Sequence, residues 1–336
     1  LDDKDTMSIF SSTDVLGVTN EQIMCPTGTL GIPEFGTNFT ISMVNETKPT
    51  TFAELVKISG LSHGTDVWLG NARDLCTPDE SGNIRVPFKE VIGCRDDIMV
   101  YLMYKGLPPI KAFKIMEFVR KGKASKEPAA WAEHAATMEE YGIEDWYIES
   151  CRKIKYMFPK AHAAAYVTSA FRIAWYKVHL PQYFYASWFS TKATDFDIEA
   201  MIKGYDAIKD RMIEIKNKGF DATNKENGIS ECLNVALEMA ARGIKISNFD
   251  LYKSKGLTFG VEDEHTLIPP FITIDGLGET VAKNIESEAQ KRPFISIEDF
   301  QNRCKVSQTL IDKMRNLGVF KGMPESSQLS LFDFGV

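Results

Sequence analysis

The chain has 336 residues, of which 44% are hydrophobic and 25% are charged, and its formal net charge is −7. This composition is typical of globular proteins, so it argues against a disordered or fibrous chain and predicts two or three domains. No apolar run reaches the roughly 18–20 residues of a membrane helix, and the acidic first residues do not resemble a signal peptide. The chain lacks a starting Met, and its six cysteines are scattered without a C-x-x-C pair. We therefore expect a cytoplasmic fragment of a longer chain, with no zinc site and no disulfide framework.

Helices are predicted over most of the first 240 residues. A loop rich in Gly, Pro and Thr at 25–37 follows a short N-terminal helix. The next helix is predicted to start after Thr51, where Glu54 completes a capping box, and to end at Gly60. Pro109 is predicted to start another helix, because proline is well tolerated in a first turn. The remaining predicted helices lie at 96–105, 129–141, 143–157 and within 181–218.

A long helix is predicted to begin at Pro159. Small and branched apolar residues recur at helical spacing and predict a buried stripe: Ala163, Val167, Ala170, Ala174 and Val178. Polar residues form a second stripe: His162, Tyr166, Ser169 and Arg172. The alanines would allow this helix to pack closely against a neighbour.

The pattern changes after about residue 240. Short β-branched or aromatic segments at 244–252, 257–263 and 266–274 predict small strands. A glycine-containing turn, Asp275-Gly276-Leu277-Gly278, then opens a helix, and the last 16 residues predict a flexible tail. The predicted fold class is therefore mainly α (α+β): a helical domain, a small β-containing domain and a tail.

Basic residues are concentrated in two segments of this acidic chain. Residues 151–181 hold six Lys or Arg and no acid, and residues 95–128 hold eight against four acids. Lys160 and His162 fall in the first helical turn after Pro159, where free N–H groups and the helix dipole favour an anion. Arg120, Lys121 and Lys123 would add charge. These residues predict a triphosphate or nucleic-acid site, although a solvated basic face and a structural histidine remain alternatives.

Three other stretches are candidates for binding. Ser62, His63, Gly64 and Thr65 form a small-residue turn that would let backbone approach a ligand, and no Ser-His-Asp spacing indicates hydrolysis. Gly276, Leu277 and Gly278 are typical of half a helix-hairpin-helix that binds DNA phosphates, or of a plain turn. The tail segment Gln328, Leu329, Ser330, Leu331 and Phe332 would insert into an apolar pocket of a partner, or dock on its own domain.

Taken together, these motifs resemble the C-terminal part of bacterial C-family replicative DNA polymerases, in the PolC type of the DNA polymerase III alpha subunit. The resemblance spans essentially the whole chain. It rests on motifs that occur in the family's order: GTLGIPEFGT (28–37), ISGLSHGTDVWLGNA (58–72), RDDIM (95–99), KGLPP (105–109), RKGK (120–123), FPKAHAAAYV (158–167), IDGLG (274–278) and QLSLF (328–332).

The resemblance implies a role for each region. Residues 1–235 would be the fingers, which bind the incoming dNTP and the template, with Arg120, Lys121, Lys123, Lys160 and His162 facing the triphosphate. Ser62, His63, Gly64 and Thr65 would line the pocket of the nascent base pair. Residues 236–322 would bind duplex DNA through Gly276, Leu277 and Gly278. Residues 323–336 would carry the sliding-clamp motif Gln328–Phe332. Primer-template DNA, dNTP, the sliding clamp and other replisome subunits are the implied partners, with no membrane.

One departure from the family pattern concerns catalysis. The family's chemistry needs palm carboxylates that hold two Mg²⁺ ions. The acids Asp2, Asp3 and Asp5 do not match the palm motif. We therefore expect no catalytic or metal-binding residue in this chain, no polymerisation by it alone, and Mg²⁺ only in the full-length enzyme. The alternative is a non-catalytic module that binds DNA and a clamp.

Overall fold

The structure is a computed structural model that describes residues 1–326. The chain packs into two compact units, each with its own core. Unit 1 comprises Leu1–Leu16 and Cys25–Trp175, and unit 2 comprises Gly17–Met24 and the chain from Tyr176 onward. The change from one unit to the other falls within helix α11 (Lys160–His179), whereas the functional boundary predicted at residue 235 falls within α15 (Asn224–Ala241).

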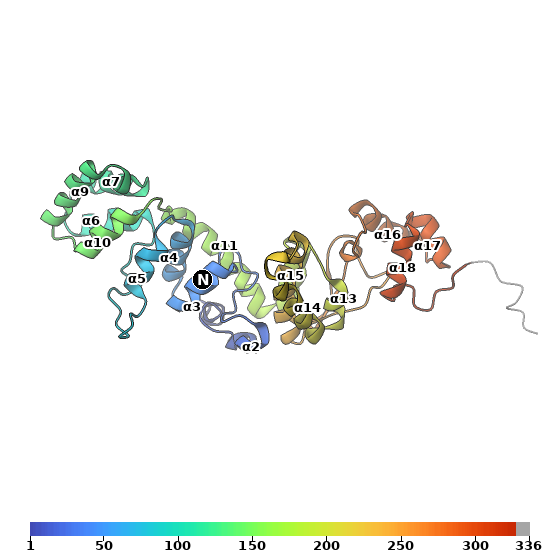
Figure 1. Ribbon diagram of the computed structural model, residues 1–336. Coiled ribbons are helices and arrows are strands. Elements are labelled where there is room, and N and C mark those ends of the chain that lie inside the picture. The colour runs from blue at the N-terminus through green and yellow to red at the C-terminus, as the bar shows by residue number, and fades with distance from the viewer. Residues whose placement is uncertain (327–336) are drawn as a thin grey trace, which may run out of the picture. The chain divides into compact units, whose positions relative to one another are not determined.

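Unit 1 is helical, and its α6, α7, α9 and α10 gather at one end (Figure 1). Its helices before α11 are α1 Lys4–Ser8, η1 Asp14–Leu16, α3 Asn38–Thr47, α4 Phe52–His63, η2 Trp68–Ala72, α5 Arg73–Cys76, α6 Arg95–Tyr104, α7 Pro109–Arg120, α8 Lys123–Lys126, α9 Pro128–Glu140 and α10 Asp145–Lys153. The capping box of Thr51 and Glu54 is confirmed, as is the start of α7 at Pro109.

Helix α4 is longer than predicted, because Gly60 does not end it. The helix continues to His63, and Gly60 is buried inside it. A Cβ placed on Gly60 would lie 2.2 Å from the carbonyl oxygen of Gly93, which is too close for any side chain. Gly60 is therefore a contact point for a loop from 33 residues further along the chain, and the prediction that it stops the helix was wrong.

Helix α11 has the two predicted faces, except that Val178, the last residue predicted for the buried stripe, is only half-buried. Ala163, Val167, Ala170 and Ala174 have no exposed surface. His162, Tyr166, Ser169 and Arg172 are exposed. The buried face has small side chains, which lets neighbouring elements approach the helix backbone.

Unit 2 combines helices with a small sheet. Its helices after α11 are α12 Pro181–Thr191, α13 Ile198–Lys203, α14 Tyr205–Lys218, η3 Gly219–Asp221, α15, η4 Phe271–Thr273, α16 Glu279–Lys291, α17 Ile297–Cys304 and α18 Gln308–Asn316, and α2 Asn20–Ile23 also belongs to it. Strands β1 Lys245–Ile246, β2 Gly260–Asp263 and β3 Thr266–Ile268 lie in the order β1-β3-β2, with β1 parallel and β2 antiparallel to β3. The predicted fold class, mainly helical with a small β part, is confirmed.

A buried ion cluster fixes the last turn of α11 within unit 2. The ammonium of Lys177 lies 2.7 Å from Glu238 on α15, and neither side chain has exposed surface. The hydroxyl of Tyr185 on α12 donates to Glu238 at 2.7 Å, and Arg242 donates to that hydroxyl at 3.1 Å. Lys177, Glu238 and Tyr185 thus each have a charged or hydrogen-bonding partner on another helix.

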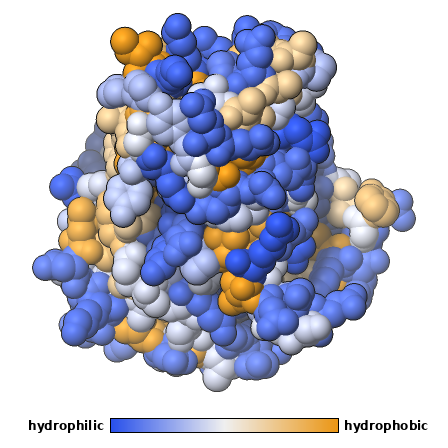
Figure 2. Space-filling view, turned by 90° about the vertical axis from the view of Figure 1, so that its left-hand side faces the viewer, coloured by the Kyte–Doolittle hydropathy of each residue, from blue (hydrophilic) through white to orange (hydrophobic). Residues whose placement is uncertain are grey.

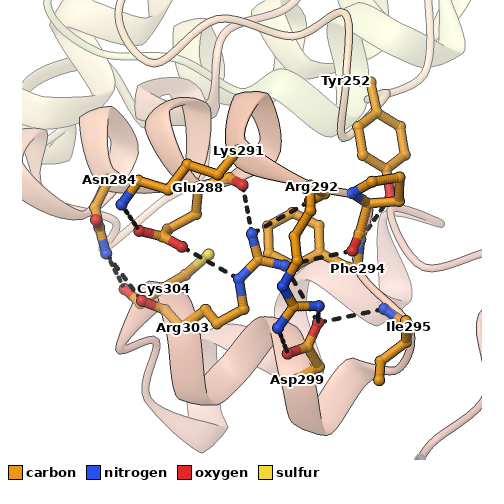
Figure 3. Close-up of polar contacts among 11 residues, drawn as sticks. Tyr252, Asn284, Glu288, Lys291, Arg292, Phe294, Ile295, Asp299, Arg303 and Cys304 are labelled. Carbon is orange, nitrogen blue, oxygen red and sulfur yellow. Dashed lines mark hydrogen bonds and ion pairs between the residues drawn. The ribbon is translucent and has the colours of Figure 1, made fainter.

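Arg303 joins α17 to α16 and to the loop between them (Figure 3). Its guanidinium donates to Glu288 at 3.1 Å, to Asp299 at 3.2 Å and to the carbonyl of Arg292 at 3.2 Å. The same group lies 4.3 Å from the ring centre of Phe294. Because one planar cation meets several acceptors at once, it holds both helices in a defined orientation.

The predicted tail starts as ordered chain. The amides of Ile297 and Glu298 donate to the carbonyls of Pro324 and Glu325, at 2.9 and 3.1 Å. Residues 324 and 325 therefore lie against the start of α17. The predicted clamp motif, Gln328–Phe332, lies outside the described residues.

All six cysteines are buried free thiols. Burial raises the pKa of Cys76 to about 11 and that of Cys94 to about 12. No two of these thiols are joined in a disulfide.

Candidate nucleic-acid interface

One backbone stretch in unit 1, residues 155–160, contacts two of the predicted site segments and the start of α6. The amide of Thr65 donates to the carbonyl of Tyr156 at 2.9 Å. The amide of Met157 donates to the carbonyl of Arg120 at 3.3 Å, and the amide of Arg95 donates to the carbonyl of Phe158 at 3.0 Å. Segments far apart in sequence thus converge on the chain that leads into α11.

Gly122 makes one of these approaches possible. Its φ is +66°, in the left-handed region, and a Cβ there would lie 2.4 Å from the carbonyl oxygen of Lys155. No side chain fits that space. The glycine inside the basic RKGK stretch therefore places this stretch directly against residues 155–157.

The three cations of the RKGK stretch are all paired with acids close to them in sequence. Arg120 contacts Glu117 through two nitrogens, one of them at 2.8 Å, and Lys121 lies 3.0 Å from the same carboxylate. These two neighbours, Arg120 first, lower the pKa of Glu117 to about 2. Lys123 pairs with Glu127 at 3.1 Å. Their positive charge is therefore partly offset before any ligand binds.

Lys160 at the start of α11 meets two acids that the sequence pattern does not reveal. Its amide donates to Asp96 at 2.7 Å, and its ammonium lies 3.1 Å from Asp97. Both acids belong to α6. The basic segment is free of acids along the chain but not in space, because carboxylates from α6 occupy the helix start that we predicted for an external anion.

Asp97 also links Lys160 to Lys57, a residue that sequence reasoning missed. Lys57 on α4 lies 3.8 Å from Asp97 and donates to the carbonyl of Lys89 at 2.9 Å. Burial lowers the pKa of Lys57, whereas Asp97 raises that of Lys160. Burial alone would raise the pKa of Asp97, but the two lysines outweigh it and lower that pKa. The members of this triad lie far apart in the sequence, on three helices, so no local sequence pattern marks it.

A hollow of about 430 Å³ opens beside the triad. Its walls include Lys57, Asp97 and Lys160 and a set of apolar and aromatic side chains: Val91, Ile92, Val100, Tyr101, Tyr104, Trp146 and Tyr147. Figure 2 shows the side of unit 1 that carries α6, α7, α9 and α10, where hydrophobic residues form separate patches between hydrophilic ones. Lys160 is the one residue of the predicted triphosphate site that lines this hollow.

The two predicted histidines, His63 and His162, lie in a row of neighbouring aromatic rings. The ring centre of Phe158 is 4.9 Å from that of His63 and 5.0 Å from that of His162, and His162 is 4.4 Å from Tyr166. His63 also contacts Glu34 at 2.5 Å. His63 and His162 thus share one neighbour, Phe158, which places the two predicted histidines in one exposed ring cluster.

Ser62 and Gly64 have local roles. Ser62 lies in the last turn of α4, not in a free turn as predicted, and its hydroxyl donates to the carbonyl of Ser59 at 3.0 Å. A Cβ on Gly64 would lie 2.6 Å from a methyl group of Val67. Gly64 therefore allows the chain to turn sharply from α4 into the contact between Thr65 and Tyr156.

In unit 2 the predicted hairpin has the expected geometry. Gly276 has a φ of +85°, and Leu277 is buried with its amide bonded to the carbonyl of Ile274 at 3.0 Å. Gly278 precedes α16 with φ −79° and ψ 158°. The turn at residues 275–278 thus leads from a short 3₁₀ helix, η4, into α16.

A second hairpin, between α17 and α18, repeats this geometry. Lys305 has a φ of +57°, Val306 is buried, and Ser307 precedes α18 with φ −69° and ψ 155°. The next buried positions also correspond: Ala282 and Ile285 in α16 match Ile311 and Met314 in α18. Sequence reasoning missed this hairpin because a lysine takes the place of the first glycine. The repeated spacing of apolar residues was the signal that could have revealed it.

Within residues 1–326 no group of three or more His, Cys, Asp or Glu side chains could hold a metal ion. Over the same residues no helix is long and apolar enough to cross a membrane.

Comparison with known proteins identifies the class. Residues 1–142 match the family model of the bacterial DNA polymerase III alpha subunit finger domain, and residues 243–329 match that of a helix-hairpin-helix motif. The chain is thus similar to parts of the bacterial DNA polymerase III alpha subunits. Among them it is similar to the PolC type: it is 55% identical to the DNA polymerase III PolC-type of Halalkalibacterium halodurans over 98% of this chain.

Two further relatives agree. The chain is 54% identical to the PolC-type enzyme of Oceanobacillus iheyensis over 98% of its length, and 54% identical to that of Streptococcus pyogenes over 99%. The chain spans 22% of the length of these relatives.

Proposed function

We propose that this segment serves a DNA-directed DNA polymerase, which adds dNTPs to a primer 3′ end on a DNA template. Unit 1 binds the incoming dNTP, and unit 2 binds the duplex. The observation that supports the first role is the convergence of residues 63–65, 95–97 and 120–122 on the 155–160 stretch. A polymerase needs cations and donors held in place around a triphosphate, because most of its catalytic effect comes from positioning and charge stabilisation.

In this proposal Lys160 exchanges its carboxylate partner for a phosphate. Its side chain is 56% exposed, so the ammonium can be reached by a ligand while Asp97 holds it at 3.1 Å. Arg120, Lys121 and Lys123 act on the triphosphate in the same way, and His162 and His63 lie beside it. Ser62, Gly64 and Thr65 shape the pocket of the nascent pair. Each cation is held in place by an acid before the substrate arrives.

The metal chemistry belongs outside this segment. Mg²⁺ bound by palm carboxylates would polarise the reacting phosphate in the full-length enzyme. The described residues do not fit such a site, since no group of three acidic, His or Cys side chains converges. We expect that this chain alone does not extend a primer.

Lys160→Ala in the full-length enzyme is expected to raise the KM for dNTPs about tenfold, the cost of losing one charge-assisted contact of about 1.4 kcal/mol. Steady-state kinetics on a primed template measure it. Lys153→Ala is the matched control: it removes a lysine of the same basic segment whose ammonium donates to the carbonyl of Gly70 at 2.9 Å. Unchanged KM and kcat for Lys160→Ala would exclude Lys160 from the triphosphate site.

The two hairpins of unit 2 are proposed to bind the DNA backbone. Turns of this kind present backbone N–H groups to phosphates without reading sequence. We assign this role to Gly276, Leu277 and Gly278 and to the corresponding residues Lys305, Val306 and Ser307. Binding of this kind weakens steeply with salt, because counterions are released from the duplex.

Gln328, Leu329, Ser330, Leu331 and Phe332 are proposed to bind the sliding clamp, which would join this cytoplasmic segment to other replisome subunits. The triple change of Gln328, Leu331 and Phe332 to Ala is expected to abolish capture of the chain by immobilised clamp, because apolar anchors carry most of the energy of such contacts. Capture equal to that of the unchanged chain would refute the assignment.

A further inference from the structure

Beside the first hairpin, one carboxylate lies between two ammonium groups. Asp275 is 2.6 Å from Lys225 on α15 and 3.0 Å from Lys313 on α18. Lys313 also donates to the backbone carbonyl of Asp275 at 3.0 Å. The three groups come from three separate elements of unit 2, so the fold assembles this cluster and no single helix does.

The cluster lies directly against the hairpin. A Cβ built on Gly276 would be 3.8 Å from the ammonium of Lys313. All three charged groups are substantially exposed, with 43–61% of each side chain accessible. An anion that reaches the backbone of Gly276 therefore comes within reach of at least one of these lysines.

Other acids decide on which side such an anion can sit. A hollow of about 300 Å³ next to the cluster is also lined by Asp197 and Glu199. Asp197 is paired with Arg211 at 3.0 Å, and Glu199 has no ion pair among the described residues. Lys225 and Lys313 line the same hollow, but Asp197 and Glu199 disfavour negative charge inside it. An anion is therefore favoured at the Gly276 side of the cluster, next to the ammonium of Lys313.

We propose that Lys225 and Lys313 contact the DNA phosphate at the first hairpin, and that Asp275 competes with this phosphate for them. The inference rests on the duplex-binding role proposed above. With Asp275 in place the cluster carries a single net positive charge instead of two, so each phosphate is held weakly. When a phosphate leaves, Asp275 forms its ion pairs with the lysines again, which allows a polymerase to move along the duplex.

The test measures binding of the purified chain to a fluorescent duplex across a series of NaCl concentrations. Asp275→Asn should tighten binding about threefold or more at low salt and steepen the log–log salt dependence by about one, the value for one added phosphate contact. Lys225→Met and Lys313→Met should each weaken binding about threefold and make that dependence shallower. These two variants keep the proposal testable if Asp275→Asn loses its fold.

Glu262→Gln is the matched control. It removes an acid from another exposed ion pair of unit 2, with Lys253 at 2.6 Å, and changes the net charge by the same amount. If both acid replacements tighten binding equally, net charge explains the effect and the competitor role is wrong. If Asp275→Asn leaves affinity unchanged while the wild type binds with steep salt dependence, the competitor role of Asp275 is wrong but the duplex-binding role of unit 2 is supported. If the wild type shows no salt-dependent binding, both the competitor role and the duplex-binding role are wrong.

Discussion

Lys177→Met is expected to lower the free energy of unfolding of unit 2 by about 3–5 kcal/mol, because it leaves a buried carboxylate without its cation. Glu238 has no exposed surface and lies 2.7 Å from Lys177. Tyr185 would remain its hydrogen-bond donor, which does not neutralise a charge. Hydrogen exchange of the amides of α12 and α15, followed in increasing urea, measures the loss.

The double variant Lys177→Met with Glu238→Gln separates charge from packing. It contains neither charge, and the glutamine can still accept from Tyr185. We expect the double variant to be more stable than Lys177→Met alone, because most of the loss in the single variant comes from the unpaired buried charge of Glu238. Losses that simply add, so that the double variant is the least stable, would show that the ion pair is not the source of the effect.

Gly122→Ala is expected to destabilise unit 1 by about 2–4 kcal/mol and to cause a large fall in the activity of the full-length enzyme. Two costs combine: the left-handed φ of +66°, and a Cβ 2.4 Å from the carbonyl oxygen of Lys155. Relief of that clash moves the 155–160 stretch on which the proposed dNTP site is built. Urea unfolding and primer extension are the measurements.

Gly142→Ala isolates the backbone cost. Gly142 has a φ of +70°, but nothing lies within 4 Å of a Cβ built on it. It should therefore lose only the roughly 1–2 kcal/mol of a left-handed alanine, with activity kept. Equal losses at both glycines would mean that contact with Lys155 does not matter.

Local signals in the sequence predicted local structure well. The capping box of Thr51 and Glu54 involves residues three apart, and Pro109 acts on its own helix. Gly60 misled the prediction because its role depends on Gly93, a distant partner in space. Sequence windows measure charge along the chain, so they could not place Asp96 and Asp97 at the start of α11.

The site was predictable to a similar degree. The sequence identified the RKGK stretch, the start of α11 and the first hairpin, because each carries a compositional signal. It did not reveal Lys57, whose partners lie on other elements, or the second hairpin, where Lys305 adopts a conformation usual for glycine. The contacts of Lys160 with Asp96 and Asp97 likewise need three-dimensional information, whereas Arg120, Lys121 and Lys123 pair with acids three or four residues away in the sequence.

The burial of all six thiols makes the chain nearly inert toward cysteine-directed reagents. With a pKa of about 11, Cys76 is a thiolate in about one molecule in ten thousand at pH 7, and its side chain is shielded from solvent. A cysteine introduced at an exposed position, such as Ser169 on α11 or Ser81 in the loop after α5, would therefore react first. Dyes and spin labels could be attached at one chosen point without removing any native cysteine.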